Sequence, residues 1–296
     1  MSIENCAPIH DLRMQLGECP IWQPDEAALY WIDIEGRAVH RFDPLRDMHH
    51  GWPVPSEPGC IAFHRDGGLV VAMREGIALL DTTSGCWTPM VDAPYEPSTM
   101  RFNDGRCDTA GRLWVGTIYE PRDHPHAALH CLERGILRDS GKRATVSNGV
   151  AFSPDNRIMY HTDTTSHCIR AYSFDAVTGA LGESSVLRQF STDRTNNYGG
   201  RPDGAAVDSE GAYWCAMYEG GRLLRLSPRG DILREIPLPV RCPTMLAFGD
   251  VDLRTLYVTT VSKNRPPAEL AAHPLSGCVL RLRVEVPGLR EHFYCP

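Results

Sequence analysis

The 296-residue sequence has no long hydrophobic run. Its first residues, MSIENCAPIHDLRM, lack an apolar segment of signal-peptide length, and no later segment is apolar for long enough to cross a bilayer. We therefore expect a cytoplasmic protein with no membrane partner.

The sequence also has no block of like charges and no cysteine motif. Lysine and arginine number 30 against 37 aspartates and glutamates, a net charge of −7, which argues against a nucleic-acid partner. The 11 cysteines are odd in number, scattered, and never spaced as C-x-x-C. Buried free thiols are therefore expected rather than disulfides.

Common catalytic signatures are absent as well: G-x-S-x-G, H-E-x-x-H, the P-loop and the EF-hand loop. The histidines of DHPHAALH (123–130) lie in a long connection and are expected in a solvated loop. No segment of comparable length has helical periodicity, so a mainly helical fold is excluded.

What the sequence does contain is a repeat of short segments rich in aromatic and β-branched residues, which are typical of β-strands. These segments are 28–34, 68–74, 112–118, 157–163, 212–218 and 255–261. Each is preceded and followed by another strand-like segment, with turn residues such as RDGG or SPDN between them. The spacing from Leu29 to Leu69, Leu113, Met159, Tyr213 and Leu256 is 40, 44, 46, 54 and 43 residues.

Units of about 45 residues with several short strands are typical of β-propeller blades. The repeat predicts an all-β fold, a six-bladed β-propeller with four-stranded antiparallel blades, as a single domain over residues 1–296. The alternative, a β-sandwich, would not require a sixfold repeat. Segment 8–16 with its flanks can supply a strand that closes the ring, and Trp31, Trp114 and Trp214 are expected to pack within blades.

The first strand of each blade lines the central channel, so residues just before these strands should meet at one mouth. Four of the six positions carry a carboxylate or carboxamide: Glu18, Asn103–Asp104, Asn148 and Asp203, with the Gly59–Cys60 region and Thr244 at the other two. Such oxygens suit a hard divalent cation. A glycine after Asp104, Asn148 and Asp203 would let the backbone turn sharply there. The alternative interpretation is that these Asp-Gly and Asn-Gly pairs are plain turns.

Several motifs together resemble the SMP-30/gluconolactonase/regucalcin-like family of six-bladed propellers, over essentially the whole length. They are LGECPIW with LYWIDI, RFNDGRCDTAGRLWVGT, SNGVAFSPD, RPDGAAVDSEGAYWCAMYEGGRLLRLSP and LYVTT. The resemblance implies one divalent cation held by Glu18, Asn148 and Asp203. It implies substrate contacts from Arg101, Asn103 and Glu120, the last being the nearest match to an acidic residue of the family. Cys19 replaces the second glycine of the family's G-E-G-P.

The resemblance further implies hydrolysis of sugar lactones, such as glucono-, galactono-, xylono- or arabinonolactone, to aldonic acids. In this interpretation Asp203 holds the cation and accepts the proton of the attacking water, while Arg101 and Asn103 orient the sugar. Ca²⁺ is the expected cation, and Mg²⁺, Mn²⁺, Fe²⁺ or Zn²⁺ is compatible with the same ligands. The expected partner is a small sugar lactone, and the expected state a monomer or weak homo-oligomer.

Three alternatives remain open at this point. The protein could be a calcium-binding regulator without significant turnover, a propeller that serves only as an interaction scaffold, or a hydrolase of phosphotriesters or other esters. Chelator-sensitive release of acid from aldonolactones would separate the lactonase from the two non-enzymatic possibilities.

Overall fold

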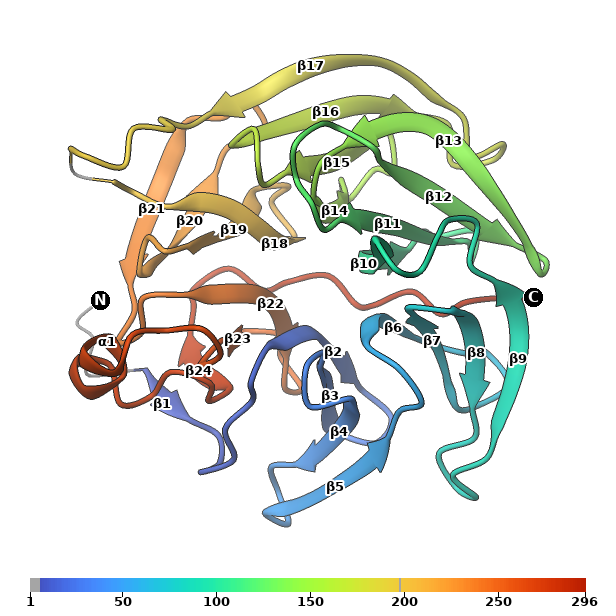
Figure 1. Ribbon diagram of the computed structural model, residues 1–296, viewed down its shortest axis with the longest axis horizontal. Coiled ribbons are helices and arrows are strands. Elements are labelled where there is room, and N and C mark those ends of the chain that lie inside the picture. Colours follow the sequence, from blue (N-terminus) through green and yellow to red (C-terminus); the bar gives the residue numbers. More distant parts are fainter. Residues whose placement is uncertain (1–5, 197) are drawn as a thin grey trace.

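Six four-stranded antiparallel sheets are arranged as blades around a central channel (Figure 1). The computed structural model describes residues 6–196 and 198–296. The predicted six-bladed β-propeller is confirmed. None of the described helices is long and apolar enough to cross a membrane.

The strands follow the chain order blade by blade, from the channel outwards. Blade 1 contains β2 (Gly17–Gln23), β3 (Ala28–Asp33), β4 (Ala38–Asp43) and β5 (Met48–Pro53). Blade 2 contains β6 (Pro58–Phe63), β7 (Leu69–Met73), β8 (Gly76–Leu80) and β9 (Trp87–Asp92). Blade 3 contains β10 (Met100–Cys107), β11 (Leu113–Tyr119), β12 (Ala127–Glu133) and β13 (Ile136–Ala144).

The second half of the ring repeats this order. Blade 4 contains β14 (Ser147–Phe152), β15 (Ile158–Asp163), β16 (Cys168–Phe174) and β17 (Leu181–Gln189). Blade 5 contains β18 (Arg201–Val207), β19 (Tyr213–Tyr218), β20 (Arg222–Leu226) and β21 (Ile232–Pro237). Blade 6 contains β22 (Pro243–Gly249), β23 (Thr255–Thr260) and β24 (Leu280–Arg283), with the six-residue helix α1 (Pro267–Ala272) between the last two.

The fourth strand of blade 6 comes from the other end of the chain. β1 (Ala7–Pro8) pairs antiparallel with β24, with Ala7 opposite Arg281 and Pro8 opposite Leu280. The N-terminal segment therefore closes the ring, as the sequence indicated, although the strand is only Ala7–Pro8, at the flank and first residue of segment 8–16.

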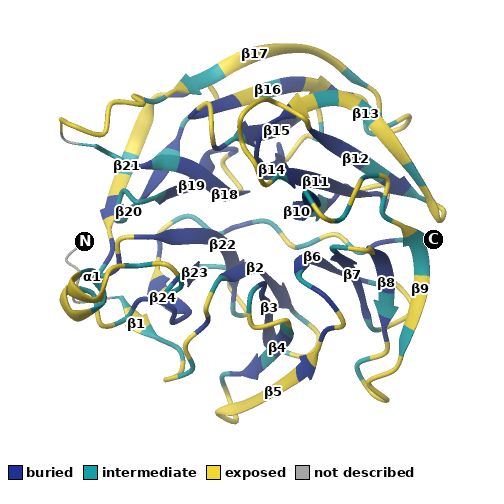
Figure 2. Ribbon diagram, in the orientation of Figure 1, coloured by how far each residue is buried: buried dark blue, intermediate teal, exposed yellow. Residues whose placement is uncertain are grey.

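Burial falls from the channel side of each blade to its rim (Figure 2). The first two strands of most blades are buried along nearly their whole length, whereas β5, β9, β13, β17 and β21 are largely exposed. The sequence did not reveal these outer strands, because their polar residues give no hydrophobic alternation.

Buried indoles hold the strands of three blades together. Trp31, Trp114 and Trp214 are each 1% exposed, and the Trp114 and Trp214 Nε1 atoms donate to Asp108 and Asp208, both at 2.8 Å. These bonds satisfy the polar atom of a large apolar ring. The prediction that the tryptophans pack the blades is confirmed, and all 11 cysteines are free thiols, seven of them buried.

Candidate functional site

Every innermost strand has a β-bulge at nearly the same place. The register with the second strand shifts within residues 18–21, 58–60, 102–105, 148–151, 202–205 and 243–246. A bulge leaves residues unpaired and re-aims their side chains. The bulges of blades 1, 3, 4 and 5 place side chains around one common cavity.

The predicted site residues occupy these bulges in two ways. Glu18 and Asn148 are the last paired residues, and the next residue of each strand, Cys19 or Gly149, has a left-handed φ of 44° or 60°. Asn103 is instead the first residue inside its bulge. The expectation that such residues precede the strands is wrong: they lie within them.

The predicted role of the glycines holds at only one of three positions. Gly149 has a positive φ, which disfavours a side chain. Gly204, after Asp203, does not; a Cβ there would lie 2.4 Å from the Met245 Cγ. The glycine in the Pro-Asp-Gly motif is required by the close approach of blades 5 and 6, not by a sharp turn.

The common cavity has a volume of about 120 Å³. Glu18, Arg101, Asn103, Asn148 and Asp203 all line it, and each is no more than 8% exposed. The structure therefore brings together five of the six predicted site residues, from blades 1, 3, 4 and 5.

A chain of hydrogen bonds connects four of these residues. An Arg101 guanidinium nitrogen donates to Asn103 Oδ1 at 2.8 Å, and Asn103 Nδ2 donates to Asn148 Oδ1 at 2.8 Å. Asn148 Nδ2 in turn donates to Asp203 Oδ1 at 2.5 Å and to Thr164 Oγ1 at 2.8 Å. Because each amide is held from both sides, the side chains are fixed in orientation before any ligand binds.

The carboxyl groups of the cavity are costly to ionise in the absence of a cation. Burial raises the pKa of Asp203 to about 7, against the opposing charge of Arg201. Burial, together with the charges of Asp203 and Asp104, raises the pKa of Glu18 well above its ordinary value. Buried carboxylates of this kind need a positive partner to stay ionised.

The donor set fits a hard divalent cation. Among the described residues, Glu18 accepts one hydrogen bond, from the Cys19 amide at 2.9 Å, and Asp203 accepts one, from Asn148. Each carboxylate therefore keeps an oxygen that accepts no hydrogen bond from the described part of the chain, and Asn148 Oδ1, which accepts one bond from Asn103, keeps a second lone pair as a neutral ligand. Two carboxylates and one amide suit Ca²⁺ or a similar ion. No group of three His, Cys, Asp or Glu side chains in the described ranges forms an alternative metal site.

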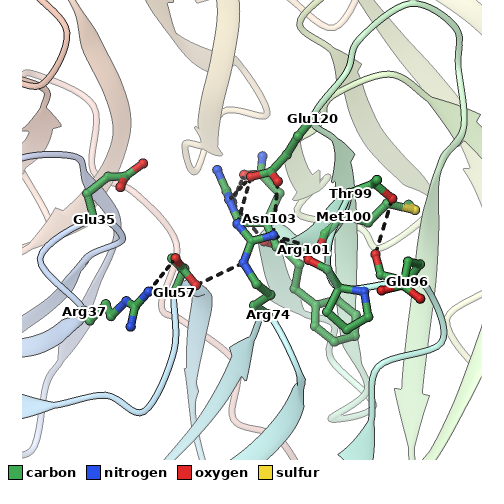
Figure 3. A network of polar contacts seen from close by, with 12 residues as sticks. Glu35, Arg37, Glu57, Arg74, Glu96, Thr99, Met100, Arg101, Asn103 and Glu120 are labelled. Atoms are coloured by element: carbon green, nitrogen blue, oxygen red, sulfur yellow. Dashed lines mark hydrogen bonds and ion pairs between the residues drawn. The ribbon is translucent and has the colours of Figure 1, made fainter.

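Glu120 is not among the residues that line the cavity. Figure 3 shows it in a polar network with Arg74 and Arg101. Its carboxylate is paired with Arg74 at 2.9 Å and lies 3.8 Å from Arg101, while the side chain is 38% exposed. Arg74 also binds Glu57 at 3.0 Å. Direct contact of Glu120 with substrate stays a prediction. Its observed contacts are with the guanidinium groups of Arg74 and Arg101.

Five further polar residues line the cavity that the sequence did not predict: Arg122, Thr164, Thr165, Arg201 and Tyr218. Arg201 precedes Asp203 by two residues in β18, so strand alternation could have placed both on one face. The pairing of Arg201 with Tyr218 in β19 follows from that register. Arg122 lies in the turn after β11, and a turn has no side-chain alternation from which the direction of a side chain could be predicted.

A larger cavity, of about 190 Å³, lies elsewhere, against the segment near the C-terminus. Its polar lining includes Arg106, Glu291 and His292, and Arg106 is already paired with Glu291 at 2.5 Å. None of the predicted site residues lines it. We therefore assign the functional site to the smaller cavity.

The fold and site have a counterpart among known proteins. The family described as the SMP-30/Gluconolactonase/LRE-like region matches residues 16–262, and the chain belongs to this family. It is 46% identical over 286 residues to a 6-deoxy-6-sulfogluconolactonase of Pseudomonas putida, covering 94% of both chains. It is 36% identical over 291 residues to a pentonolactonase of Haloferax volcanii, covering 95% of both.

A solved structure has the same architecture. Regucalcin of Agrobacterium tumefaciens, a calcium-binding protein, matches with a TM-score of 0.91 at 25% identity, covering 97% of this chain and 96% of that one. The whole ring is therefore shared.

Proposed function

We propose that this protein is a metal-dependent lactonase that hydrolyses sugar lactones to aldonic acids. The observation that carries the proposal is the convergence of Glu18, Asn148, Asp203, Arg101 and Asn103 on one buried cavity. The names of the Pseudomonas and Haloferax relatives, which match over almost their full lengths, support the same reaction class.

Glu18, Asn148 and Asp203 would hold the divalent cation, with Ca²⁺ expected first. When bound, the cation would polarise the lactone carbonyl and stabilise the negative charge that develops on it. The protein supplies the oxygen ligands, and the bonds of Asn148 to Asn103 and Thr164 keep its carboxamide in place.

Asp203 is the general base of the proposed reaction. One of its oxygens is held by Asn148, and the other would accept a proton from water in the cavity as that water attacks the carbonyl carbon. The acyl C–O bond of the ring then breaks, and the same proton can be returned to the departing ring oxygen. Water and lactone together give one hydroxy acid.

Arg101 and Asn103 orient the sugar. The guanidinium of Arg101 donates to the Phe102 carbonyl at 2.9 Å as well as to Asn103, so it is held rigidly. Asn103 Nδ2 already donates to the Ser147 carbonyl and to Asn148 Oδ1, so Asn103 would accept a hydrogen bond from a substrate hydroxyl through Oδ1, while the remaining Arg101 donors would bind other hydroxyl groups. These bonds would fix the carbonyl relative to Asp203.

The second candidate function is a calcium-binding regulator without significant turnover. The structural likeness to a calcium-binding regucalcin favours this candidate. It requires the same cation site but no base and no substrate contacts.

The discriminating experiment is acid release from a panel of pentono- and hexonolactones, with elemental analysis of the purified protein. A lactonase is expected to lose turnover with chelator and regain it when a divalent cation is restored. Asp203→Asn should reduce turnover by about a thousandfold, and Glu18→Gln should weaken both turnover and cation binding. Cation binding without turnover of any lactone would instead support the regulator.

A further inference from the structure

The cavity carries more positive charge than a neutral lactone requires. Three guanidinium groups, those of Arg101, Arg122 and Arg201, line it together with the two carboxylates of Glu18 and Asp203. A divalent cation bound by these carboxylates would neutralise them and leave the three guanidinium charges in excess. A cavity lined by charges of one sign attracts ligands of the opposite sign, which favours a ligand that supplies negative charge.

Arg201 has unused hydrogen-bonding capacity. Its Nε is buried and has no hydrogen-bond partner among the described residues. Its guanidinium carbon lies 4.9 Å from the centre of the Tyr218 ring, which supports the group from one face. A guanidinium of this kind can bind a planar or tetrahedral anion through two donors.

The carboxylate nearest to Arg201 is shared with other arginines. Glu219 lies 3.7 Å from Arg201 but 3.0 Å from Arg194, and its other oxygen is 3.6 Å from Arg265. Arg265 has its own partner in Glu269, with two hydrogen bonds of 2.7 Å, so Glu219 is shared mainly by Arg194 and Arg201. Positive charge remains at this edge of the cavity.

Arg122 adds a second guanidinium group to the subsite. Within the described part of the chain, its side chain has no ion pair or side-chain hydrogen bond, and it is exposed at the turn after β11. Its charge, with those of Arg201 and Arg101, opposes the rise in the pKa of Asp203, so the three groups act on the same space.

We propose that Arg201 and Arg122 form an anion subsite that binds an acidic substituent of the lactone, a sulfonate or a phosphate, at the end of the sugar remote from the carbonyl. This inference rests on the proposed lactonase function and names its substrate class. Arg101 and Asn103 would hold the sugar ring, while Arg201 and Arg122 would select the charged end. The name of the Pseudomonas relative, which acts on a sulfonated gluconolactone, is consistent with this assignment.

The test compares kcat and KM for gluconolactone, its 6-deoxy-6-sulfo derivative and its 6-phosphate, using the cation-loaded protein. The wild-type protein should prefer one of the two acidic lactones through a lower KM, and the preferred one identifies the anion. Arg201→Gln should reduce the ratio of kcat/KM for acidic over neutral lactone by about 10- to 100-fold, the value of one or two charged hydrogen bonds. Arg201→Lys, which keeps the charge, should restore part of the ratio.

Arg194→Gln is the matched control, because Arg194 pairs with the same Glu219 but does not line the cavity. It should leave the selectivity ratio within about twofold, since only a screened rim charge is removed. Equal turnover of neutral and acidic lactones by the wild type, or an unchanged ratio in Arg201→Gln and Arg122→Gln, would overturn the subsite.

A binding measurement separates this inference from the lactonase proposal. Calorimetry with 6-deoxy-6-sulfogluconate, the open-chain acid, should show binding that Arg201→Gln weakens about tenfold or more. Such binding without hydrolysis of any lactone would retain the anion subsite and refute the lactonase. Hydrolysis of lactones without binding that depends on Arg201 would retain the lactonase and refute the subsite.

Discussion

The strands β10 and β18, in blades 3 and 5, use one backbone arrangement for two purposes. In each, an arginine is followed two residues later by the first residue of the bulge: Arg101 and Asn103 in β10, Arg201 and Asp203 in β18. The bulge re-aims equivalent positions in both blades.

The two arginines differ in how their donors are used. Arg101 is 8% exposed and bonded to the Phe102 carbonyl and to Asn103, whereas Arg201 has a buried Nε without a partner among the described residues. The β10 pair is already fixed in orientation, while the β18 pair keeps donors and a carboxylate available to ligands. Rigid positioning and ligand chemistry are therefore divided between two copies of the same repeat.

The largest expected difference between the two strands is in catalysis. Asp203→Asn should reduce kcat/KM on the preferred lactone by about a thousandfold, because it removes the proposed base and a charged cation ligand. Asn103→Ala should reduce it by only about 10- to 100-fold, because it removes a group that orients the substrate. Steady-state kinetics at saturating cation measure both, and equal losses would contradict the division of roles.

The cation dependence of stability should follow the same division. Added Ca²⁺ should raise the melting temperature of the wild type and of Asn103→Ala, but not of Asp203→Asn, since a ligand that binds only the folded state stabilises it. Differential scanning calorimetry with and without chelator provides the measurement. A full response in Asp203→Asn would remove Asp203 from the proposed cation site.

Packing behind β18 should tolerate no added methyl group. Gly204→Ala should lower the free energy of unfolding by about 3 kcal/mol, because the new Cβ would approach Met245 Cγ to 2.4 Å and its Cα to 2.9 Å. Gly135→Ala is the control: Gly135 has a φ of 74°, but no atom lies within 4 Å of the position that a Cβ would take, so only about 1 kcal/mol should be lost. Urea denaturation compares them.

The two arginines should differ in their contribution to the fold. Arg101→Met leaves the buried Asn103 Oδ1 without its donor and should cost about 1–3 kcal/mol of unfolding free energy. Arg201→Met should cost less than about 1 kcal/mol, since it removes only a long ion pair and a ring contact. The same denaturation experiment tests this, and a larger loss for Arg201 would reverse the comparison.

The smallest expected effects concern the carboxylates beside these arginines. Glu120→Gln should release Arg74 and lower kcat/KM for all lactones by a few-fold, because Arg101 loses a neighbouring charge. Glu219→Gln should instead lower the KM for acidic lactones by about two- to threefold, because Arg201 loses a competing carboxylate. Opposite changes in kcat/KM for acidic lactones in the two variants would show that Glu120 and Glu219 have different roles. Changes in the same direction would contradict that difference.

The sequence could predict those features whose positions recur in every blade. The six-bladed ring, the inner strands and the convergence of Glu18, Asn148 and Asp203 all follow from segments that recur with the blade. The alternation of side chains along a strand places Arg201 on the same face as Asp203, so its position could also be predicted. The Asp-Gly pair alone does not indicate it. What depends on turns and on contacts between blades was out of reach: the position of Arg122, and the pairing of Glu120 with Arg74, which lies 46 residues earlier.

The left-handed conformation at Cys19 also follows from tertiary structure. A cysteine rarely adopts a φ of 44°, yet Cys19 is fully buried and its amide binds Glu18 while its sulfur contacts the Ile61 backbone at 3.3 Å. The sequence showed only that Cys19 replaces a glycine of the family motif. The structure shows the contacts that hold the backbone beside that ligand.

The short pairing between β1 and β24 has a consequence for the stability of the ring. β1 and β24 share only two residue pairs, although the Ile9 and Met14 amides add bonds to the Val279 and Gly277 carbonyls further along the seam. We expect the two-residue strand β1 to open first in hydrogen exchange. A cation bound by Glu18, Asn148 and Asp203 would connect blades 1, 4 and 5 across the channel. Cation binding should then slow hydrogen exchange at the β1–β24 contact. Occupancy of the proposed cation site would thus be coupled to the stability of the whole propeller.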